Sequence, residues 1–119
     1  MDIQNRLHIV PKGWGFEKWI VNNEKYCGKI LYIVKDRKCS WHYHKVKDET
    51  FYIQSGKIVL YYGQHDDIKM STSIILNKGH HFHIPTGLKH QMCAIEDTEL
   101  FEFSTQHFDD DSIRLQKGD

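Results

Sequence analysis

Two short stretches, WHYHKVKDETFYIQSG at residues 41–56 and GHHFHIPTGLKH at residues 79–90, hold six of the nine histidines in this 119-residue chain. Within the first, His42 and His44 are two residues apart, so on a β-strand both side chains point to the same face. Glu49 follows after four residues and opens the next apolar run. If these strands pair as a hairpin or lie across a barrel, both imidazoles and the carboxylate converge on one point.

The second stretch supplies a fourth polar group. His90 begins another strand, three residues after the glycine of the turn Pro85-Thr86-Gly87. Three imidazoles and a carboxylate are a typical ligand set for a transition metal, with room left for water or substrate. The sequence therefore predicts one divalent metal ion (zinc, manganese, iron or nickel) on His42, His44, Glu49 and His90. Open coordination positions would make such a site catalytic.

Short segments rich in β-branched and aromatic residues recur along the chain, with turn signals between them, at spacings near ten residues. This pattern is typical of an all-β sandwich or barrel. One short helix is expected near Asp110–Leu115, and the run Asp109-Asp110-Asp111 is interpreted as its solvated start or a turn. The expected strands are Lys18–Val21, Lys29–Val34, Ser40–His44, Thr50–Gln54, Lys57–Tyr62, Ser71–Leu76, His81–Ile84, His90–Ala94 and Leu100–Thr105.

Length and charge narrow the class of protein. The length fits a single domain, residues 1–119, that can bury a core without disulfides. Sixteen basic and sixteen acidic residues give a formal net charge of zero, which argues against nucleic acid or an anionic membrane and favours a small-molecule partner. No run reaches the roughly 18 apolar residues of a membrane helix, and Met1–Val10 lacks the apolar core of a signal peptide. Three cysteines without an export signal indicate free thiols and a cytoplasmic location.

The two stretches resemble the paired motifs of the cupin superfamily. His42, His44, Glu49 and Gly56 have the spacing of the first motif, and Gly79, Pro85-Thr86-Gly87 and His90 that of the second. The two motifs occur in the right order and about twenty residues apart, which makes the match specific. The resemblance implies a double-stranded β-helix, or jelly-roll barrel, with the metal inside its wider end. It also implies a homodimer, because barrels of this kind commonly pair through their sheets.

A looser resemblance, to the cupin domain of type II mannose-6-phosphate isomerases, covers most of the chain. It rests on Lys12–Glu17, Lys29–Ile33, Ile84–His90 and Asp110–Arg114. The chain departs from that family where it has His42 in place of glutamine, Lys47 in place of arginine and Thr50 in place of histidine. These 119 residues contain no counterpart of the nucleotidyltransferase domain found beside many such cupins. These departures weaken the inference to the sugar-phosphate substrate more than the inference to fold and metal.

The narrower resemblance implies a metal-dependent aldose–ketose isomerase acting on a sugar or sugar phosphate. In such a reaction the metal acts as a Lewis acid, and a base removes the proton next to the carbonyl. By alignment, Glu102 on the last expected strand, or an unassigned group near the metal, is the base. Lys47 and Lys29 are aligned to hold substrate charge. Two alternatives stay open: an iron-dependent cupin dioxygenase or lyase, and a non-catalytic cupin that binds a metal or a sugar.

The remaining histidines, tryptophans and cysteines allow two interpretations each. His81 and His83 share a face and would either contact substrate in the barrel or lie on the surface, with a slight preference for the surface. Trp14 and Trp19 would close the barrel end rather than stack on a sugar. Further expectations are packing of Trp41 away from the ligand face, buried thiols at Cys39 and Cys93, solvated rings at His65 and His80, and no functional signal at His8 and His107.

Overall fold

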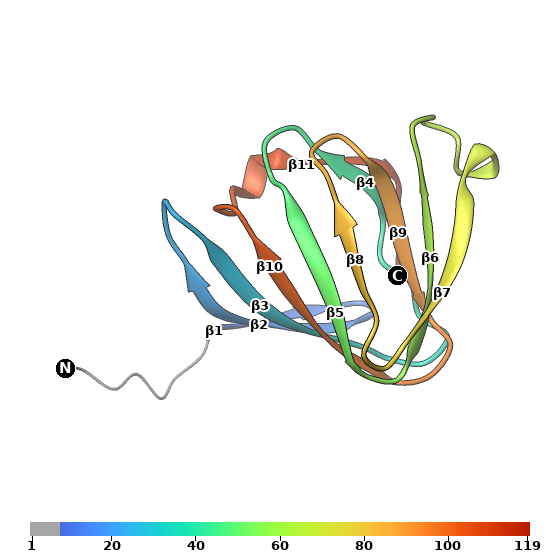
Figure 1. Cartoon of the computed structure of the whole chain (residues 1–119), viewed down its shortest axis with the longest axis horizontal. Coiled ribbons are helices and arrows are strands. Elements are labelled where there is room, and N and C mark those ends of the chain that lie inside the picture. The colour runs from blue at the N-terminus through green and yellow to red at the C-terminus, as the bar shows by residue number, and fades with distance from the viewer. Residues whose placement is uncertain (1–7) are drawn as a thin grey trace.

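The computed structural model describes residues 8–119, so part of the segment inspected for a signal peptide lies outside the described residues. Within these residues, eleven strands form two antiparallel sheets that face each other (Figure 1). The six-stranded sheet contains β1 (His8–Lys12), β2 (Gly15–Asn22), β3 (Cys27–Ile33), β10 (Thr98–Ser104), β5 (Glu49–Ser55) and β8 (His81–Ile84), in that order. The five-stranded sheet contains β11 (Ser112–Gln116), β4 (Trp41–His44), β9 (Lys89–Ala94), β6 (Lys57–Gly63) and β7 (Thr72–Asn77).

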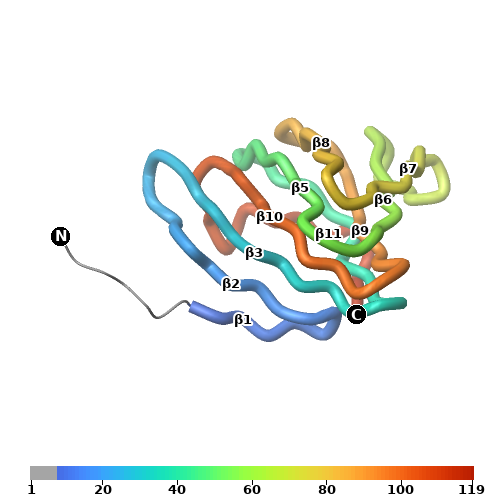
Figure 2. The backbone as a smooth tube through the Cα atoms, turned by 60° about the horizontal axis from the view of Figure 1, so that its bottom comes forward, coloured from blue at the N-terminus to red at the C-terminus, as the bar shows by residue number. Residues whose placement is uncertain are grey.

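This architecture confirms the expected jelly-roll barrel, and each of the nine expected strands overlaps an observed one. From β3 onward, successive strands alternate between the sheets, except for the hairpin of β6 and β7, so His42 of β4 and Glu49 of β5 come from opposite walls. Figure 2 shows β3, β10 and β5 side by side along one wall. Strand β1, which the sequence pattern did not indicate, pairs with β2 at the edge of this wall. None of the helical segments in residues 8–119 is long and apolar enough to cross a membrane.

The expected helix near Asp110–Leu115 is wrong. A 3₁₀ turn, η2 (Asp109–Asp111), leads directly into β11, which pairs with β4. The acidic run is a local helix-start signal, but long-range hydrogen bonds override it. Asp111 is buried, and its carboxylate accepts backbone N–H groups of Lys45, Val46 and Lys47 at 2.9, 3.0 and 2.9 Å. These bonds fix the chain next to β4 and favour a strand there.

Inward-facing side chains divide the barrel into an apolar part and a polar part. On β3, β5 and β10 every second residue points inward, as the alternating burial shows. Leu100 lies between Leu31 and Ile53 in the sheet, and all three are buried. Further along the same strands, the inward positions change to polar residues: Lys29, Glu49 and Glu102. Apolar packing therefore closes one end, and the polar side chains surround a cavity at the other.

The turn between β5 and β6 requires a glycine. Gly56 has φ +92°, a left-handed conformation that favours glycine. A Cβ atom there would also collide with the carbonyl oxygen of Asp97. The glycine of the first motif thus sets the turn that returns the chain from the wall of β5 to the wall of β6.

Candidate metal centre and its cavity

The three predicted histidines meet inside the barrel. His42 and His44 project from β4, and His90 on the neighbouring strand β9 is the direct register partner of His42. One nitrogen from each of the three rings lies within 4.8 Å of the others. The ring centroids of His42 and His90 are 4.4 Å apart. Spacings of this size suit one ion held by all three rings.

Backbone acceptors orient each ring. In every case Nδ1 faces a carbonyl oxygen of the chain, so it carries the ring proton and donates it. Nε2 is then left as a lone-pair nitrogen, the form in which imidazole binds a metal. The pairs are His42 with Ser40 O at 2.9 Å, His44 with Asp111 O at 3.1 Å, and His90 with Leu88 O at 2.9 Å.

Glu49 completes the group from the opposite wall. Its Oε2 lies 3.2 Å from His44 Nε2 and 3.3 Å from His90 Nε2. Among the described residues, Glu49 Oε2 and His90 Nε2 are buried side-chain atoms without a hydrogen-bond partner. A buried carboxylate oxygen beside two lone-pair nitrogens needs a cation between them, so the residues fit a divalent metal.

The ring of His42 stays neutral at physiological pH. Burial lowers the pKa of His42 to about 3, and the neighbouring His90 and His44 lower it in the same direction. A neutral imidazole keeps its lone pair available. The site therefore requires no proton release from His42 before an ion enters.

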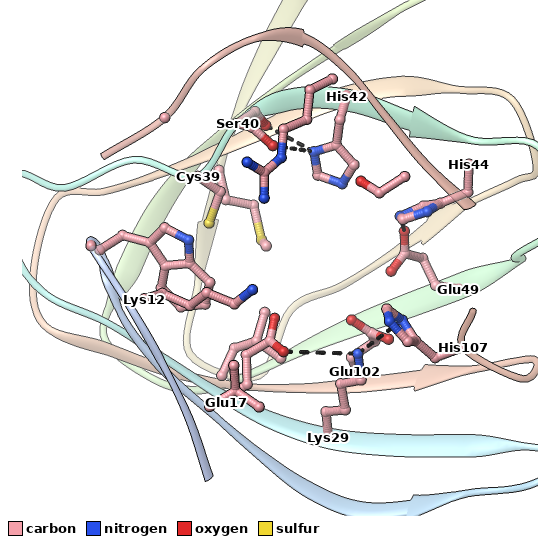
Figure 3. Close-up of a pocket in the computed structure, with 18 of the residues that line it drawn as sticks. Lys12, Glu17, Lys29, Cys39, Ser40, His42, His44, Glu49, Glu102 and His107 are labelled. Atoms are coloured by element: carbon pink, nitrogen blue, oxygen red, sulfur yellow. Dashed lines mark hydrogen bonds and ion pairs between the residues drawn. The ribbon is translucent and has the colours of Figure 1, made fainter. Parts of the chain in front are cut away.

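A cavity of about 730 Å³ opens from this centre toward solvent. Figure 3 shows His42, His44 and Glu49 on one side of it, and Lys29, Glu102 and His107 along another. Glu102 and Lys47 are buried and form an ion pair, with Nζ to Oε2 at 3.0 Å. Burial raises the pKa of Glu102, and the charge of Glu49 raises it further. The predicted base candidate thus shares the cavity with the predicted metal ligands.

A sequence profile of the cupin domain matches residues 30–105. The chain belongs to the cupin family. A search of curated protein sequences found no match. Among solved structures, this cupin is similar to the capsular polysaccharide assembling protein CapF from Staphylococcus aureus, with a TM-score of 0.82, 20% identity, and 97% of this chain and 34% of CapF covered.

Two further structures have the same fold. A variant of the oxalate decarboxylase of Bacillus subtilis has a TM-score of 0.78 and 19% identity, with 92% of this cupin and 30% of the other chain covered. KdgF from Halomonas sp. has a TM-score of 0.69 and 17% identity, with 80% of this cupin and 81% of the KdgF chain covered. This cupin spans about a third of the CapF and oxalate decarboxylase chains.

His107 is the main cavity residue of this cupin that the sequence did not indicate. Its Nδ1 lies 2.9 Å from Lys47 Nζ and 3.1 Å from Lys29 Nζ, so it accepts from one or both lysines. Nε2 then carries the proton and donates it to Asp109 at 3.0 Å. Burial, followed by the charges of Lys29 and Lys47, lowers the pKa of His107 to about 4. No motif or spacing marks this residue, because it follows β10 in a loop that only the fold brings to Lys47.

The predicted contacts His81 and His83 do not reach the cavity. Both are exposed on β8, and their register partners Tyr52 and Thr50 lie on the outer face of the sheet. His83 Nε2 pairs with Asp48 at 2.9 Å, in solvent. The positions of His81 and His83 agree with the preferred expectation that both lie on the surface.

The tryptophans and cysteines occupy both the core and the cavity wall. Trp14 belongs to the buried core and also borders the cavity. Trp19 lines the cavity as well, with Lys29 Nζ 4.0 Å from the centre of its ring. Trp41 is buried and its indole N–H donates to the carbonyl of Asp66 at 2.7 Å. Cys39 is buried and Cys93 is half-buried, and both thiols are unpaired. Burial raises the pKa of Cys39, and neither cysteine belongs to the metal cluster.

Proposed function

We propose that this cupin is a metal-dependent enzyme that isomerises an aldose and a ketose, acting on a sugar or sugar phosphate. The observation that carries the proposal is one buried carboxylate, Glu102, in the same cavity as the metal cluster. A proton-transfer enzyme needs a base and a source of positive charge near one substrate. Both are available on facing walls of this barrel.

A divalent ion on the four ligands would stabilise negative charge that develops on the substrate oxygens. The chain's own residues handle the proton. In its carboxylate form Glu102 takes the proton from the carbon next to the carbonyl, the C–H electron pair forms a C=C bond, and the C=O electron pair moves to the carbonyl oxygen. The proton of the neighbouring hydroxyl passes to that oxygen. Glu102 then returns its proton to the former carbonyl carbon, and the carbon that carried the hydroxyl becomes the new carbonyl. Its raised pKa makes Glu102 a stronger base, and Lys47, 3.0 Å away, holds the carboxylate in place.

The carbohydrate assignment has separate support. The cavity is large enough for a small sugar derivative, and it is lined by donors and acceptors as well as Trp14 and Trp19. One of the similar folds is described as a capsular polysaccharide assembling protein. The looser resemblance to mannose-6-phosphate isomerases points to the same class of substrate.

Deuterium incorporation tests the proposal. The protein, loaded in turn with zinc, manganese, iron or nickel, is incubated with aldoses and aldose phosphates in D₂O, and NMR follows deuterium at C2 and formation of the ketose. We expect exchange that falls about 100-fold or more in Glu102→Gln, with metal content unchanged. The control is Glu99→Gln, since Glu99 points outward on the same strand. Unchanged turnover in Glu102→Gln removes it from the mechanism, and no exchange with any substrate contradicts the isomerase.

A dioxygenase or lyase is the second candidate. Three neutral imidazoles with one carboxylate form the ligand set that the sequence shares with many cupin dioxygenases, and His42 lies in that set. Oxygen uptake by the iron-loaded protein with small organic acids separates the two reactions, because isomerisation consumes no oxygen. Binding of a sugar or metal with no product over hours would instead favour a non-catalytic module.

We also propose that two copies pair through the six-stranded sheet and that the protein works in the cytoplasm. The outer face of this sheet presents Ile20 and Phe103, which are 52% and 57% exposed, next to Tyr52 stacked on Phe101. Burying such a face favours association. The three unpaired thiols agree with a reducing compartment. A monomer in light scattering would overturn the dimer.

A further inference from the structure

The charged side chains around the cavity are unevenly paired. Lys47 is paired with Glu102 at 3.0 Å, and Lys29 lies 3.9 Å from Glu17. These two lysines, expected to hold substrate charge, are therefore already neutralised by carboxylates. Three other cations line the same cavity: Lys12, Arg114 and Lys117. None of the three forms an ion pair with another residue of the described range 8–119.

Arg114 and Lys12 come from opposite walls of the barrel. Arg114 is on β11, where its register partner is the candidate metal ligand His42. Lys12 ends β1, and Figure 3 shows it across the cavity from His44 and Glu49. The following residue, Gly13, packs on Asp119. The segment that follows β11 therefore ends beside the strand that carries Lys12.

The acidic groups nearby do not cancel this charge. Asp119 also lines the cavity, but its Oδ2 accepts the backbone N–H of Lys38 at 2.9 Å and lies outside ion-pair distance of both cations. Glu17 accepts the indole N–H of Trp19 at 2.9 Å. Once Lys29 is paired with Glu17 and Lys47 with Glu102, the unpaired cations Lys12, Arg114 and Lys117 outnumber the nearby carboxylate of Asp119. This surplus of positive charge attracts an anion.

We propose that the cavity binds an anionic sugar, with its phosphate or carboxylate held by Arg114 and Lys12 and its carbonyl end directed to the metal centre. The guanidinium of Arg114 offers paired N–H donors that match either anion. Lys12 adds a point charge from the other wall. The inference rests on the proposed function for the sugar part of the ligand, whereas the anion site stands on the unpaired charges themselves.

Calorimetric titration with ligands that cannot be isomerised tests the anion site apart from catalysis. The metal-loaded protein is titrated with sorbitol 6-phosphate, gluconate and uncharged sorbitol. We expect at least one anion to bind about tenfold or more tightly than sorbitol, and the better of the two identifies phosphate or carboxylate. Arg114→Gln and Lys12→Gln should each lower the affinity for that anion by about 5- to 20-fold. Each should change the affinity for sorbitol by less than about twofold. Raising the salt concentration should lower the affinity for the anion and leave the affinity for sorbitol unchanged.

Arg37→Gln is the matched control, because Arg37 is exposed in a turn and does not line the cavity. We expect no change in this variant. Equal affinity for charged and uncharged ligands, no binding of either anion at about 10 mM, or unchanged anion affinity in both cavity variants would overturn the proposal. Anion binding without isomerisation would instead contradict only the proposed function. Arg114 is exposed, so its loss should leave the fold intact, and Lys12→Gln provides an independent test.

Discussion

Glu49 Oε2 lies 3.3 Å from His90 Nε2, and within residues 8–119 neither of these buried atoms has a hydrogen-bond partner. The proton of His90 is on the other nitrogen, because Nδ1 donates to the carbonyl of Leu88. Two groups with lone pairs thus face each other in a nearly dry site. Such a contact is unfavourable unless a cation lies between them. The pair links the first sequence motif to the second and gives the metal site its clearest physical support.

Purified protein should contain about one equivalent of divalent metal. Because the ion binds only the folded chain, saturating it at about a thousand times its Kd adds about 4 kcal/mol to the free energy of unfolding. Removal by a chelator should therefore lower Tm by roughly 10 °C or more. His90→Ala should abolish metal binding, as measured by plasma mass spectrometry, while His83→Ala, at an exposed position, should keep it. Full metal content in His90→Ala would contradict the assigned site.

Breaking the ion pair of Lys47 and Glu102 should destabilise the fold through the charge left behind. Both side chains are buried, so Lys47→Met leaves an uncompensated carboxylate and should cost about 3 kcal/mol. The double variant Lys47→Met/Glu102→Gln removes both charges and should recover part of that loss. Urea unfolding of the two single variants and the double variant measures this coupling. Additive losses would show that the two charges do not depend on each other.

Acid should destabilise the metal-free protein, and His107 should account for part of the effect. Its pKa is about 4 in the folded state and near 6.5 when exposed, so between these values the unfolded chain binds more protons. Stability is then fully present above about pH 6.5 and is lost as pH falls toward about 4. The contribution is about 2 kcal/mol. Urea unfolding of wild type and His107→Gln at about pH 7.5 and 4.5 should show a smaller pH effect in the variant. An equal effect in both would rule out His107 as a source.

The apolar end of the barrel should depend on Leu100. This side chain is 0% exposed and lies between Leu31 and Ile53 on the neighbouring strands. Leu100→Ala removes buried methyl groups and leaves a cavity, which should cost about 3 kcal/mol. The exposed Ile75 on β7 provides the comparison, and Ile75→Ala should change stability by less than about 0.5 kcal/mol. Chemical denaturation gives both values, and similar losses would contradict the assigned core.

The amino-acid sequence was enough to predict the barrel and to single out the residues of the candidate metal site. Strand periodicity is local, since neighbouring side chains alternate faces, and it located every strand except β1 and β11. The ligand spacing is local too: His42 and His44 share one strand, and fixed turns place Glu49 and His90 at the starts of others. These features need no knowledge of which distant segments meet.

The remaining features of the site depend on contacts between segments that are far apart in the sequence. Asp111 could not be recognised as a buried group, because its carboxylate bonds to the segment 45–47, more than sixty residues away. For the same reason, His107 has no sequence signal, although it contacts Lys29 and Lys47. For His81 and His83, strand alternation predicts that both side chains share one face, but it does not say whether that face is the inner or the outer one. Pairing across the barrel fixes these choices, and within residues 8–119 it leaves three cations of the cavity unpaired: Arg114, Lys12 and Lys117.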